Sequence, residues 1–474
     1  MAEAAEATGV TWVASGAAGA ASEAGSGGSA GALPAVEGIT AAIHRGAVEA
    51  LAADEPTWLR DRRLEAWSVY ERTPMPTTRL EEWRYTDLRR KLKLDRLKLL
   101  PWQSRKFEAS RAPVALVAAM AADEAASGHV IEIDGAVAQV DLLDELRSKG
   151  VILGSLRGSV RAYPDLLEPL LATEAVPATL GKFQALNAAL WTDGTFLFVP
   201  SGVRLDLPVR VSRWFAQPGR AVFSRTLIVA EAGSQVSFVD EALSSDFAEQ
   251  TFVSSAVEVF ARDGAQIQYV SLQRMGWGAF HLSQQRTIAQ RDATLDTLNV
   301  SLGGSVSRVD LSAELRGPGA NSDMLGVYFG ERDQHFDHNT RQDHIAPNAK
   351  SDLLYKGALD GKSRGVFRGI IKVHKGAQRT DAYQTNRNLL LSKHARAESL
   401  PRLEIEADDV RCSHGATVGQ LEEEHVFYLM SRGLTRPQAE RLVVTGFLEE
   451  VLSRLPLGGV VEKVTGIIEE RLRG

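Results

Sequence analysis

The chain has 474 residues, of which 44% are hydrophobic and 24% charged, which is enough apolar material for two or three globular units. Its net charge of −6 and its pI near 6.0 exclude an overall basic field that would attract nucleic acid or an anionic membrane. The single cysteine excludes an internal disulfide framework and a metal site built only from its own thiolates. No apolar run approaches the roughly 18 residues of a spanning helix, so we expect a soluble protein of a reducing compartment.

The first segment, residues 1–36, consists mainly of Ala, Gly, Ser and Glu and has almost no large apolar side chains. Such a tract cannot offset its ordering entropy by burial, so the composition predicts a disordered tail. Glu3 and Glu6, together with the lack of an apolar stretch, argue against a secretory signal and against a transit peptide.

Residues 37–180 have the pattern of a small helical or α+β domain. Helical spacing of apolar residues runs from Ile39 to Tyr70 and ends at the Pro74–Pro76 break. The stretch PTTRLEEWRYTDL that begins at Pro76 is predicted to be a polar loop anchored by Trp83, Tyr85 and Leu88. Further on, APVALVAAM (112–120) and HVIEIDGAV (129–137) predict β segments, and Leu142–Leu146 predicts a helix.

The middle of the chain repeats. A small turn element precedes a β-like run at spacings of 31, 28, 27, 29 and 28 residues, at Gly233, Gly264, Asp292, Gly319, Asn348 and Gly376. Each period contains two β-like runs and no helical pattern, which favours a β-solenoid. A propeller blade needs about four strands in roughly 40–45 residues and fits less well. We expect the solenoid to occupy residues 181–420.

The predicted last strand carries the only cysteine. From Val410 to Val418 odd and even positions alternate, so Cys412 and His414 point the same way on a mostly apolar face. A solenoid leaves open strand edges at its ends, and these can pair with another chain. The helices that follow are therefore expected to cap or flank this end.

Residues 421–474 are predicted to form a C-terminal helical domain. A first helix runs from Glu422 to Arg432 and ends before Gly433, a natural left-handed residue. Thr435 and Gln438 have the spacing of a capping box that opens a second helix reaching about Leu455. The exposed part of this helical pair is a candidate docking surface.

Three motifs suggest chemistry but have simpler interpretations. GALDGKS (357–363) has one residue too few for a phosphate-binding loop and lies within a β repeat, so it predicts a turn. The basic stretch 356–379 lacks the interleaved aromatic residues of a nucleic-acid groove. A polar cluster matches no standard zinc spacing, and surface or rung-stacking histidines explain it better; its members are His335, Asp337, His338, Asp343 and His344.

Cys412 and His414 admit three interpretations. A buried small thiol with a core histidine is the simplest. The pair also suits two ligands of an intersubunit metal site that a partner chain completes. A Cys–His nucleophile is disfavoured, because side chains two positions apart on a strand lie roughly parallel and no third orienting group is evident.

Four stretches together resemble the SufB/SufD family of iron–sulfur cluster assembly proteins. They are PTTRLEEWRYTDL from Pro76, GVFRGIIKVHKGAQRTDAYQTNRNLLLS from Gly365, LEIEADDVRCSHGATVGQ from Leu403 and FYLMSRGL from Phe427. Within the family, the single cysteine in RCSHGATVG and the N-terminal stretch resemble SufD more than SufB. The resemblance runs from about Pro76 to the last helices.

This resemblance implies a right-handed parallel β-helix core flanked by an N-terminal α+β/helical domain and a C-terminal helical domain. It implies a non-enzymatic scaffold that pairs with SufB through the β-helix and binds the SufC ATPase through C-terminal helices, at Phe427, Tyr428, Arg432 and Phe447. A transient iron–sulfur cluster would form at the interface with SufB, with His414 as the family's histidine and Cys412 beside it.

The resemblance further implies no nucleotide site in this chain, a sulfur donor that reaches the cluster through the complex, and the cytoplasm or, in a eukaryote, the plastid stroma. Two alternatives stay open: a secreted-type β-solenoid enzyme acting on carbohydrate, and a homodimeric relative that pairs through the same edge. The enzyme should stack carboxylates on one solenoid face, and no such pattern is seen across the periods.

Overall fold

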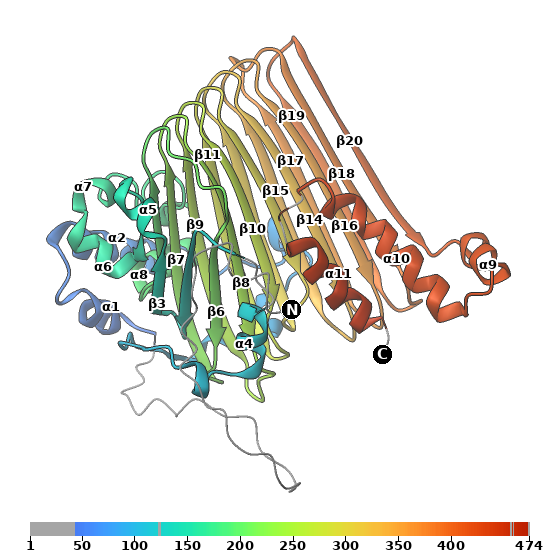
Figure 1. The fold of residues 1–474 in the computed structure, drawn as a ribbon, viewed down its shortest axis with the longest axis horizontal. Helices are drawn as coiled ribbons and strands as arrows, with labels where there is room; N and C mark the ends of the chain where they lie inside the picture. The colour runs from blue at the N-terminus through green and yellow to red at the C-terminus, as the bar shows by residue number, and fades with distance from the viewer. Residues whose placement is uncertain (1–42, 122–124, 456, 458, 473–474) are drawn as a thin grey trace, which may run out of the picture.

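Two β-sheets run the length of the molecule and enclose a long apolar interior (Figure 1). The structure is a computed structural model that describes residues 43–121, 125–455, 457 and 459–472. The predicted tail 1–36 and the start of the predicted helical pattern at Ile39 lie outside these residues. The predicted parallel β-solenoid is confirmed, with one strand of each turn in each sheet.

Sheet A contains the odd-numbered main strands. Its members are β4 (Ile152–Ser155), β5 (Thr195–Val199), β7 (Arg220–Ala230), β9 (Thr251–Ala261), β11 (Ala279–Ala289), β13 (Val306–Leu315), β15 (His335–His344), β17 (Arg364–Val373) and β19 (Arg396–Ile405), with β1 (Lys98–Leu99) beside β7. From β5 to β19 these strands pair in parallel with the next strand of the sheet.

Sheet B contains β3 and all the even-numbered strands except β4, which belongs to sheet A. Its members are β2 (Gly128–Ile133), β3 (Ala136–Leu142), β6 (Val209–Phe215), β8 (Gln235–Ser244), β10 (Gln266–Arg274), β12 (Thr294–Ser301), β14 (Asn321–Gly330), β16 (Lys350–Leu359), β18 (Thr380–Leu390) and β20 (Val410–Gln420). β2–β4 come from the segment 128–155, so part of the N-terminal region extends both sheets.

The helices cluster at the two ends of the chain. They are α1 (Arg45–Ala52), α2 (Thr57–Arg72), α3 (Leu88–Lys91), α4 (Val114–Ala121), α5 (Asp144–Ser148), α6 (Leu156–Ala162), α7 (Pro164–Leu167), α8 (Lys182–Leu190), α9 (Glu423–Ser431), α10 (Arg436–Leu452) and α11 (Val460–Arg471). Short 3-10 turns lie at Glu81–Trp83, Leu94–Arg96, Ala109–Arg111 and Ala178–Leu180. No helix in the described ranges is long and apolar enough to cross a membrane.

The turns predicted from the repeat are confirmed, and at five of the six positions the named residue is itself left-handed. These five residues adopt a left-handed backbone, with φ of 68° at Gly233, 67° at Gly264, 53° at Asp292, 77° at Gly319 and 61° at Asn348. Glycine has no steric penalty there, and Asn and Asp tolerate it better than most residues.

The sixth predicted turn is also present, because Gly376 lies in the turn that precedes β18, but this glycine is not the left-handed residue. The left-handed residue of that turn is Arg379, with φ of 59°, which lies 31 residues (379 − 348) after Asn348. The register agrees, because Lys350 pairs with Asp381. The turn is three residues longer than the motif suggested, and a left-handed arginine is too uncommon for a sequence pattern to predict.

The predicted β segment at 112–120 is also wrong, because this stretch forms helix α4. Pro113 accepts the first helical hydrogen bonds from Leu116 and Val117, and the alanines that follow are the strongest helix formers. Leu116 and Ala119, three positions apart, are buried against strands β2, β6 and β8, whereas Val114 is 82% exposed. A short apolar run cannot by itself distinguish strand from helix. The predictions at 129–137 and 142–146 are met by β2–β3 and by α5.

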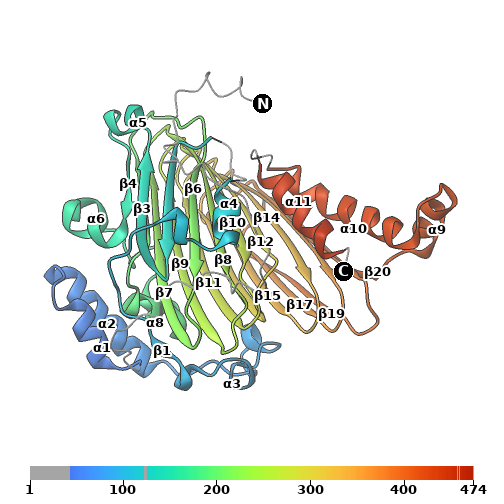
Figure 2. The same ribbon diagram turned by 60° about the horizontal axis from the view of Figure 1, so that its bottom comes forward.

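Helices cover the outer faces of both sheets. α1, α2 and α8 pack on the outer face of sheet A near its N-terminal end, whereas α10 and α11 pack on sheet B (Figure 2). Asn187 of α8 donates to the carbonyls of Ser224 (3.2 Å) and Ser254 (3.1 Å), so this helix is pinned to β7 and β9.

The C-terminal helices do not cap the last rung. α10 contacts β14 and β16, and its position is fixed by ion pairs with sheet B. The buried Lys356 ammonium donates to the Phe447 carbonyl (2.8 Å) and contacts Glu450, while Arg454 pairs with Asp323 (2.7 Å) and Asp352 (2.9 Å). The last strands therefore keep an open edge.

The segment 76–88 crosses the outer face of sheet A. Trp83 and Leu88 are partly or fully buried, and the Arg308 guanidinium lies 3.7 Å from the Trp83 ring centre. Thr86 Oγ1 contacts His335 Nε2 (2.8 Å) and donates to Asp337 (2.5 Å). The predicted anchoring of this loop is confirmed, and it explains why His335 is buried although it points outward.

Candidate functional site at the open end of the solenoid

Strand β20 places Cys412 and His414 over the interior of the solenoid. β20 pairs in parallel with β18 so that Cys412 lies beside Ala382 and His414 beside Gln384. Both β18 residues are buried inside the solenoid, whereas their neighbour Tyr383 is 44% exposed on the outside. Because side chains alternate along a strand, Cys412 and His414 share the inward face, as predicted.

In the part of the chain that the structure describes, no further rung covers this face. β20 is the last strand of sheet B and β19 the last strand of sheet A, and each pairs on one side only. β19 carries Pro401 and several charged residues, which discourage pairing. β20 has eleven residues with no proline and only one charge, Arg411, so its edge is an unprotected template for a second chain.

The two side chains differ in environment. Cys412 is partly buried against the last apolar cluster, with Leu403 and Val410 beside it. This burial raises the pKa of the Cys412 thiol, and the nearby Asp381 carboxylate raises it further. His414 is exposed, so it is not a core histidine of the single chain.

Beneath His414 the interior has an unsatisfied polar atom. Gln384 is 1% exposed and donates weakly to the carbonyls of Gly369 and Arg402, both at 3.4 Å. Its Oε1 has no hydrogen-bond partner among the described residues. The sequence analysis did not identify Gln384. This residue precedes His414 by 30 positions (414 − 384), which is the separation between register partners on β18 and β20.

The other histidines do not form a site. His338 and His344 point into the solenoid, where they contact Ser301 (3.0 Å) and Ser351 (2.8 Å). His335 points the opposite way, as predicted. Within the described parts of the chain, no group of three or more His, Cys, Asp or Glu side chains is placed to hold a metal ion. GALDGKS ends β16 and forms the next turn, as predicted.

Helix α9 carries an exposed aromatic patch. Phe427 is 71% exposed and Tyr428 55%, and the Arg432 guanidinium donates to the Tyr428 hydroxyl (3.1 Å) while lying 5.2 Å from its ring centre. The structure thus brings three of the four predicted docking residues together. Phe447 lies apart on α10, partly buried, with the Lys356 ammonium 4.5 Å from its ring centre.

The patch and the open strand are adjacent in the chain. β20 ends at Gln420 and α9 begins at Glu423, so two residues connect them. The predicted capping interaction is present, since Gln438 Oε1 accepts from the Thr435 backbone N–H (2.8 Å). Arg436 of α10 pairs with Glu423 (2.7 Å), which braces α9 against α10.

The segment 76–88 reaches the same end from the other sheet. Glu81 contacts Arg368 of β17 (3.2 Å) and Arg402 of β19 (3.5 Å). In the sequence, Glu81 is separated from Arg368 by 287 positions (368 − 81) and from Arg402 by 321 positions (402 − 81). No local sequence pattern predicts contacts at such separations. The last rungs are therefore tied to the N-terminal part of the chain.

Comparison with known proteins identifies relatives over almost the whole chain. Residues 214–447 match the family "SUF system FeS cluster assembly, SufBD core domain", and residues 41–211 match "SufBD protein N-terminal region". An iron–sulfur cluster assembly protein SufD of Bacillus subtilis is 30% identical over 423 residues, which covers 88% of this chain and 95% of the relative. A SufBD family protein of Staphylococcus haemolyticus is 27% identical over 411 residues, covering 86% and 88%.

Proposed function

Because this chain belongs to the SufBD family of iron–sulfur cluster assembly proteins, we propose that it acts as a SufD-like scaffold subunit without catalytic activity of its own. It pairs with a SufB chain through β20, and a nascent cluster is held at that interface as cargo. It also binds the SufC ATPase through α9. Its compartment is the bacterial cytoplasm, in keeping with the bacterial relatives and the unpaired cysteine.

The observation that carries the proposal is the open edge of β20, which has a single charged residue and carries Cys412 and His414 on its inward face. An imidazole and a thiolate are both iron ligands, but two ligands do not complete a cluster site. A partner strand laid against β20 would cover these side chains and bring its own ligands. A bond to iron would also overcome the raised pKa of Cys412, because a bound metal stabilises the thiolate.

The exposed patch of Phe427, Tyr428 and Arg432 supports ATPase docking. Aromatic residues and arginine are enriched where interfaces gain most of their binding energy. Two residues separate α9 from β20, so movement of a docked ATPase pair would pull on the strand that holds the cluster. ATP would act in this way through the partner, without a nucleotide site in this chain.

The test of the cluster site is co-expression with SufB and SufC and anaerobic purification of the complex. His414→Ala should leave the complex intact and remove most of the iron–sulfur absorbance. His394→Ala is the matched control, because His394 is exposed in the loop before β19. If His414→Ala prevented assembly, His414 would be structural, and if the cluster were retained the ligand role would be wrong.

The test of the docking patch is the same purification with Phe427→Ala and Tyr428→Ala combined. SufC should be lost while SufB stays bound. Val114→Ala is the control, since Val114 is an exposed apolar residue on the distant helix α4. A chain that recovers neither partner, or that forms only a homodimer through β20, would contradict the SufD-like assignment.

A further inference from the structure

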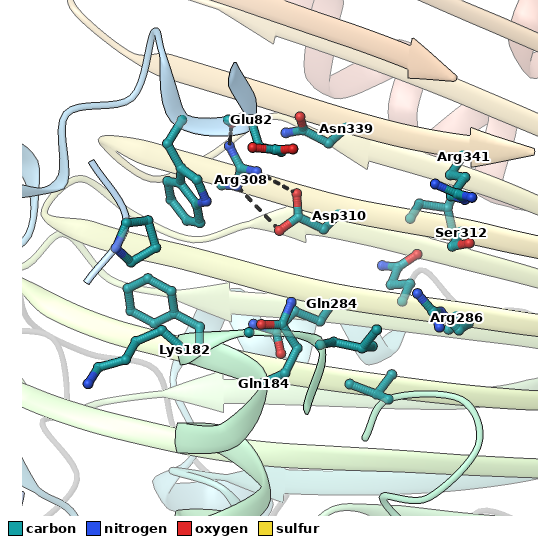
Figure 3. A pocket seen from close by; sticks show the side chains of 18 of the residues that line it. Glu82, Lys182, Gln184, Gln284, Arg286, Arg308, Asp310, Ser312, Asn339 and Arg341 are labelled. Carbon is teal, nitrogen blue, oxygen red and sulfur yellow. Dashed lines mark hydrogen bonds and ion pairs between the residues drawn. The ribbon is translucent and has the colours of Figure 1, made fainter. Parts of the chain in front are cut away.

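A pocket of about 510 Å³ lies on the outer face of sheet A, and the function proposed above does not use it (Figure 3). Its floor is formed by β11, β13, β15 and β17, and its walls by residues 73–83 and the start of α8. This volume is in the range of sites for small organic molecules, roughly 300–1,000 Å³.

Three hydrogen-bond donors form a row across the floor. Ser312 pairs in register with Arg286 on one side and with Arg341 on the other. Neighbouring strands lie roughly 4.8 Å apart, so the serine hydroxyl lies between two guanidinium groups. Figure 3 shows all three on the same side of the pocket.

Both arginines keep donors for a ligand. Arg286 contacts Glu314 (3.0 Å), and Arg341 donates from Nε to Asp343 (3.0 Å). A guanidinium has five N–H donors, so one carboxylate does not saturate it. Burial lowers the pKa of Arg286, although the carboxylates of Glu314 and Asp343 act in the opposite direction.

Two buried polar side chains in the pocket lack partners. The Ser312 hydroxyl and both amide atoms of Gln284 form no hydrogen bond with any described residue, although the side chains are only 7% and 3% exposed. An unsatisfied buried polar group costs about 1–3 kcal/mol. A bound molecule with matching acceptors and donors would remove that cost, once the neighbouring side chains that shield these three atoms had moved slightly.

The far side of the pocket has an aromatic wall. The rings of Trp83 and Phe183 lie 5.7 Å apart, and Leu180 also lines the pocket. In Figure 3, Lys182 at the start of α8 and the pair Arg286 and Arg341 lie on opposite sides of the pocket. The pocket therefore has an aromatic wall near Lys182 and an anion-binding end at Arg286 and Arg341, with Gln284 between them.

We propose that this pocket binds a phosphate monoester that carries a flat apolar ring. The three phosphate oxygens would accept from Arg286, Ser312 and Arg341, and the ring would lie against Phe183 and Trp83. A phosphate suits the site better than a carboxylate, because three donor groups match three terminal oxygens. Gln284 would bind a polar group on the ring or the ester oxygen.

The test is calorimetric titration of the full chain with 1-naphthyl phosphate, inorganic phosphate and 1-naphthol. The naphthyl phosphate should bind at least about tenfold more tightly than either fragment, because each fragment fills only one end of the pocket. Equal affinity for inorganic phosphate would mean an unspecific anion site, and absence of heat with all three probes would overturn the proposal.

Variants assign the binding to this pocket. Ser312→Ala and Arg341→Gln should each weaken naphthyl phosphate by about tenfold, the value of one charge-assisted hydrogen bond. Arg147→Gln is the matched control, since Arg147 also pairs with a single carboxylate, Asp144, on a distant helix. Unchanged affinity in both pocket variants, with melting temperatures like that of the wild type, would contradict the site. A negative result for this pocket would leave the tests of SufB and SufC binding unaffected.

Discussion

At the N-terminal end of the solenoid, here called the closed end, both sheets finish in antiparallel strands, β3 and β4, whereas at the C-terminal end, the open end, they finish in the parallel strands β20 and β19. A buried carboxylate at the closed end is fully hydrogen-bonded within the chain. Asp193 accepts from the backbone of Val137 (3.1 Å), Arg157 (3.1 Å) and Gly194 (2.8 Å) and from the Ser155 hydroxyl (2.8 Å). One buried carboxylate thereby joins β3, β4 and α6.

The open end leaves comparable groups unsatisfied. Gln384 Oε1 is buried without a partner in the described chain, and His414 above it is exposed. The two ends therefore differ in these residues: the Asp193 carboxylate is fully partnered by its own chain, whereas Gln384 and His414 could still gain contacts from a partner. The predictions below test this difference, and they begin with the largest effect.

Buried charges should stabilise the closed end far more than exposed charges stabilise the open end. Arg225 and Glu258 pair at 2.7 Å with both side chains 0% exposed, so Arg225→Leu leaves an unpaired buried carboxylate and should cost about 3–5 kcal/mol. Arg364 pairs with the part-exposed Glu398 near the open end, and Arg364→Leu should cost about 1 kcal/mol or less. Urea unfolding followed by circular dichroism measures both, and similar costs would contradict the contrast.

A positive charge added at the open end should weaken the binding of SufB, whereas the same charge added at the closed end should not. Ala416→Lys places an ammonium on the inward face of β20, where a partner strand would bury it without a counter-ion. SufB should bind about 100-fold more weakly, a loss of about 2.7 kcal/mol. Gln139→Lys on β3 is the control and should bind SufB as the wild type does. If both variants bound normally, the partner would use a different surface.

The sequence predicts regular and local features of this molecule well. The left-handed turns at Gly233 and Asn348 can be recognised from the sequence, because few residue types tolerate that backbone conformation. The shared inward face of Cys412 and His414 follows from strand alternation alone. The sequence pattern is misleading where it is ambiguous: the segment that forms α4 resembles a strand, and in the turn before β18 the left-handed residue is Arg379 and not Gly376.

Contacts between distant segments cannot be predicted from local sequence patterns. The pair of Glu81 with Arg402 and the pocket around Ser312 depend on which rung lies beside which segment. Strand register fixes those positions only after all turn lengths are known, and one misplaced turn shifts every later residue. The exposure of Phe427 and the partial burial of Phe447 likewise depend on how α10 packs on sheet B.

Acid should destabilise the protein through its interior histidines. Burial lowers the pKa of His338 to about 4, below its ordinary value, so the folded state stays neutral while the unfolded state takes up a proton below pH 6.5. Stability therefore falls as the pH drops from 6.5 toward 4, by on the order of 2 kcal/mol at pH 5 for this residue. Urea titrations at pH 7.5 and pH 5 measure the loss.

A variant at position 338 tests this assignment. His338→Gln should reduce the acid loss by on the order of 2 kcal/mol, because the glutamine does not titrate. An acid loss in His338→Gln equal to that of the wild type would contradict the role of this histidine.

The smallest effect concerns the reactivity of Cys412. Because burial raises its thiol pKa, its alkylation by iodoacetamide should be slow at pH 8 and should accelerate above pH 9. Binding of SufB should slow the reaction about tenfold, equivalent to about 1.4 kcal/mol of protection. The control carries Cys412→Ser with Gln139→Cys, which moves the only thiol to the closed end, and its rate should not change on binding. Equal protection of both thiols would mean that the partner covers the whole solenoid, and no protection of Cys412 would mean that the open edge of β20 is not where the two chains meet.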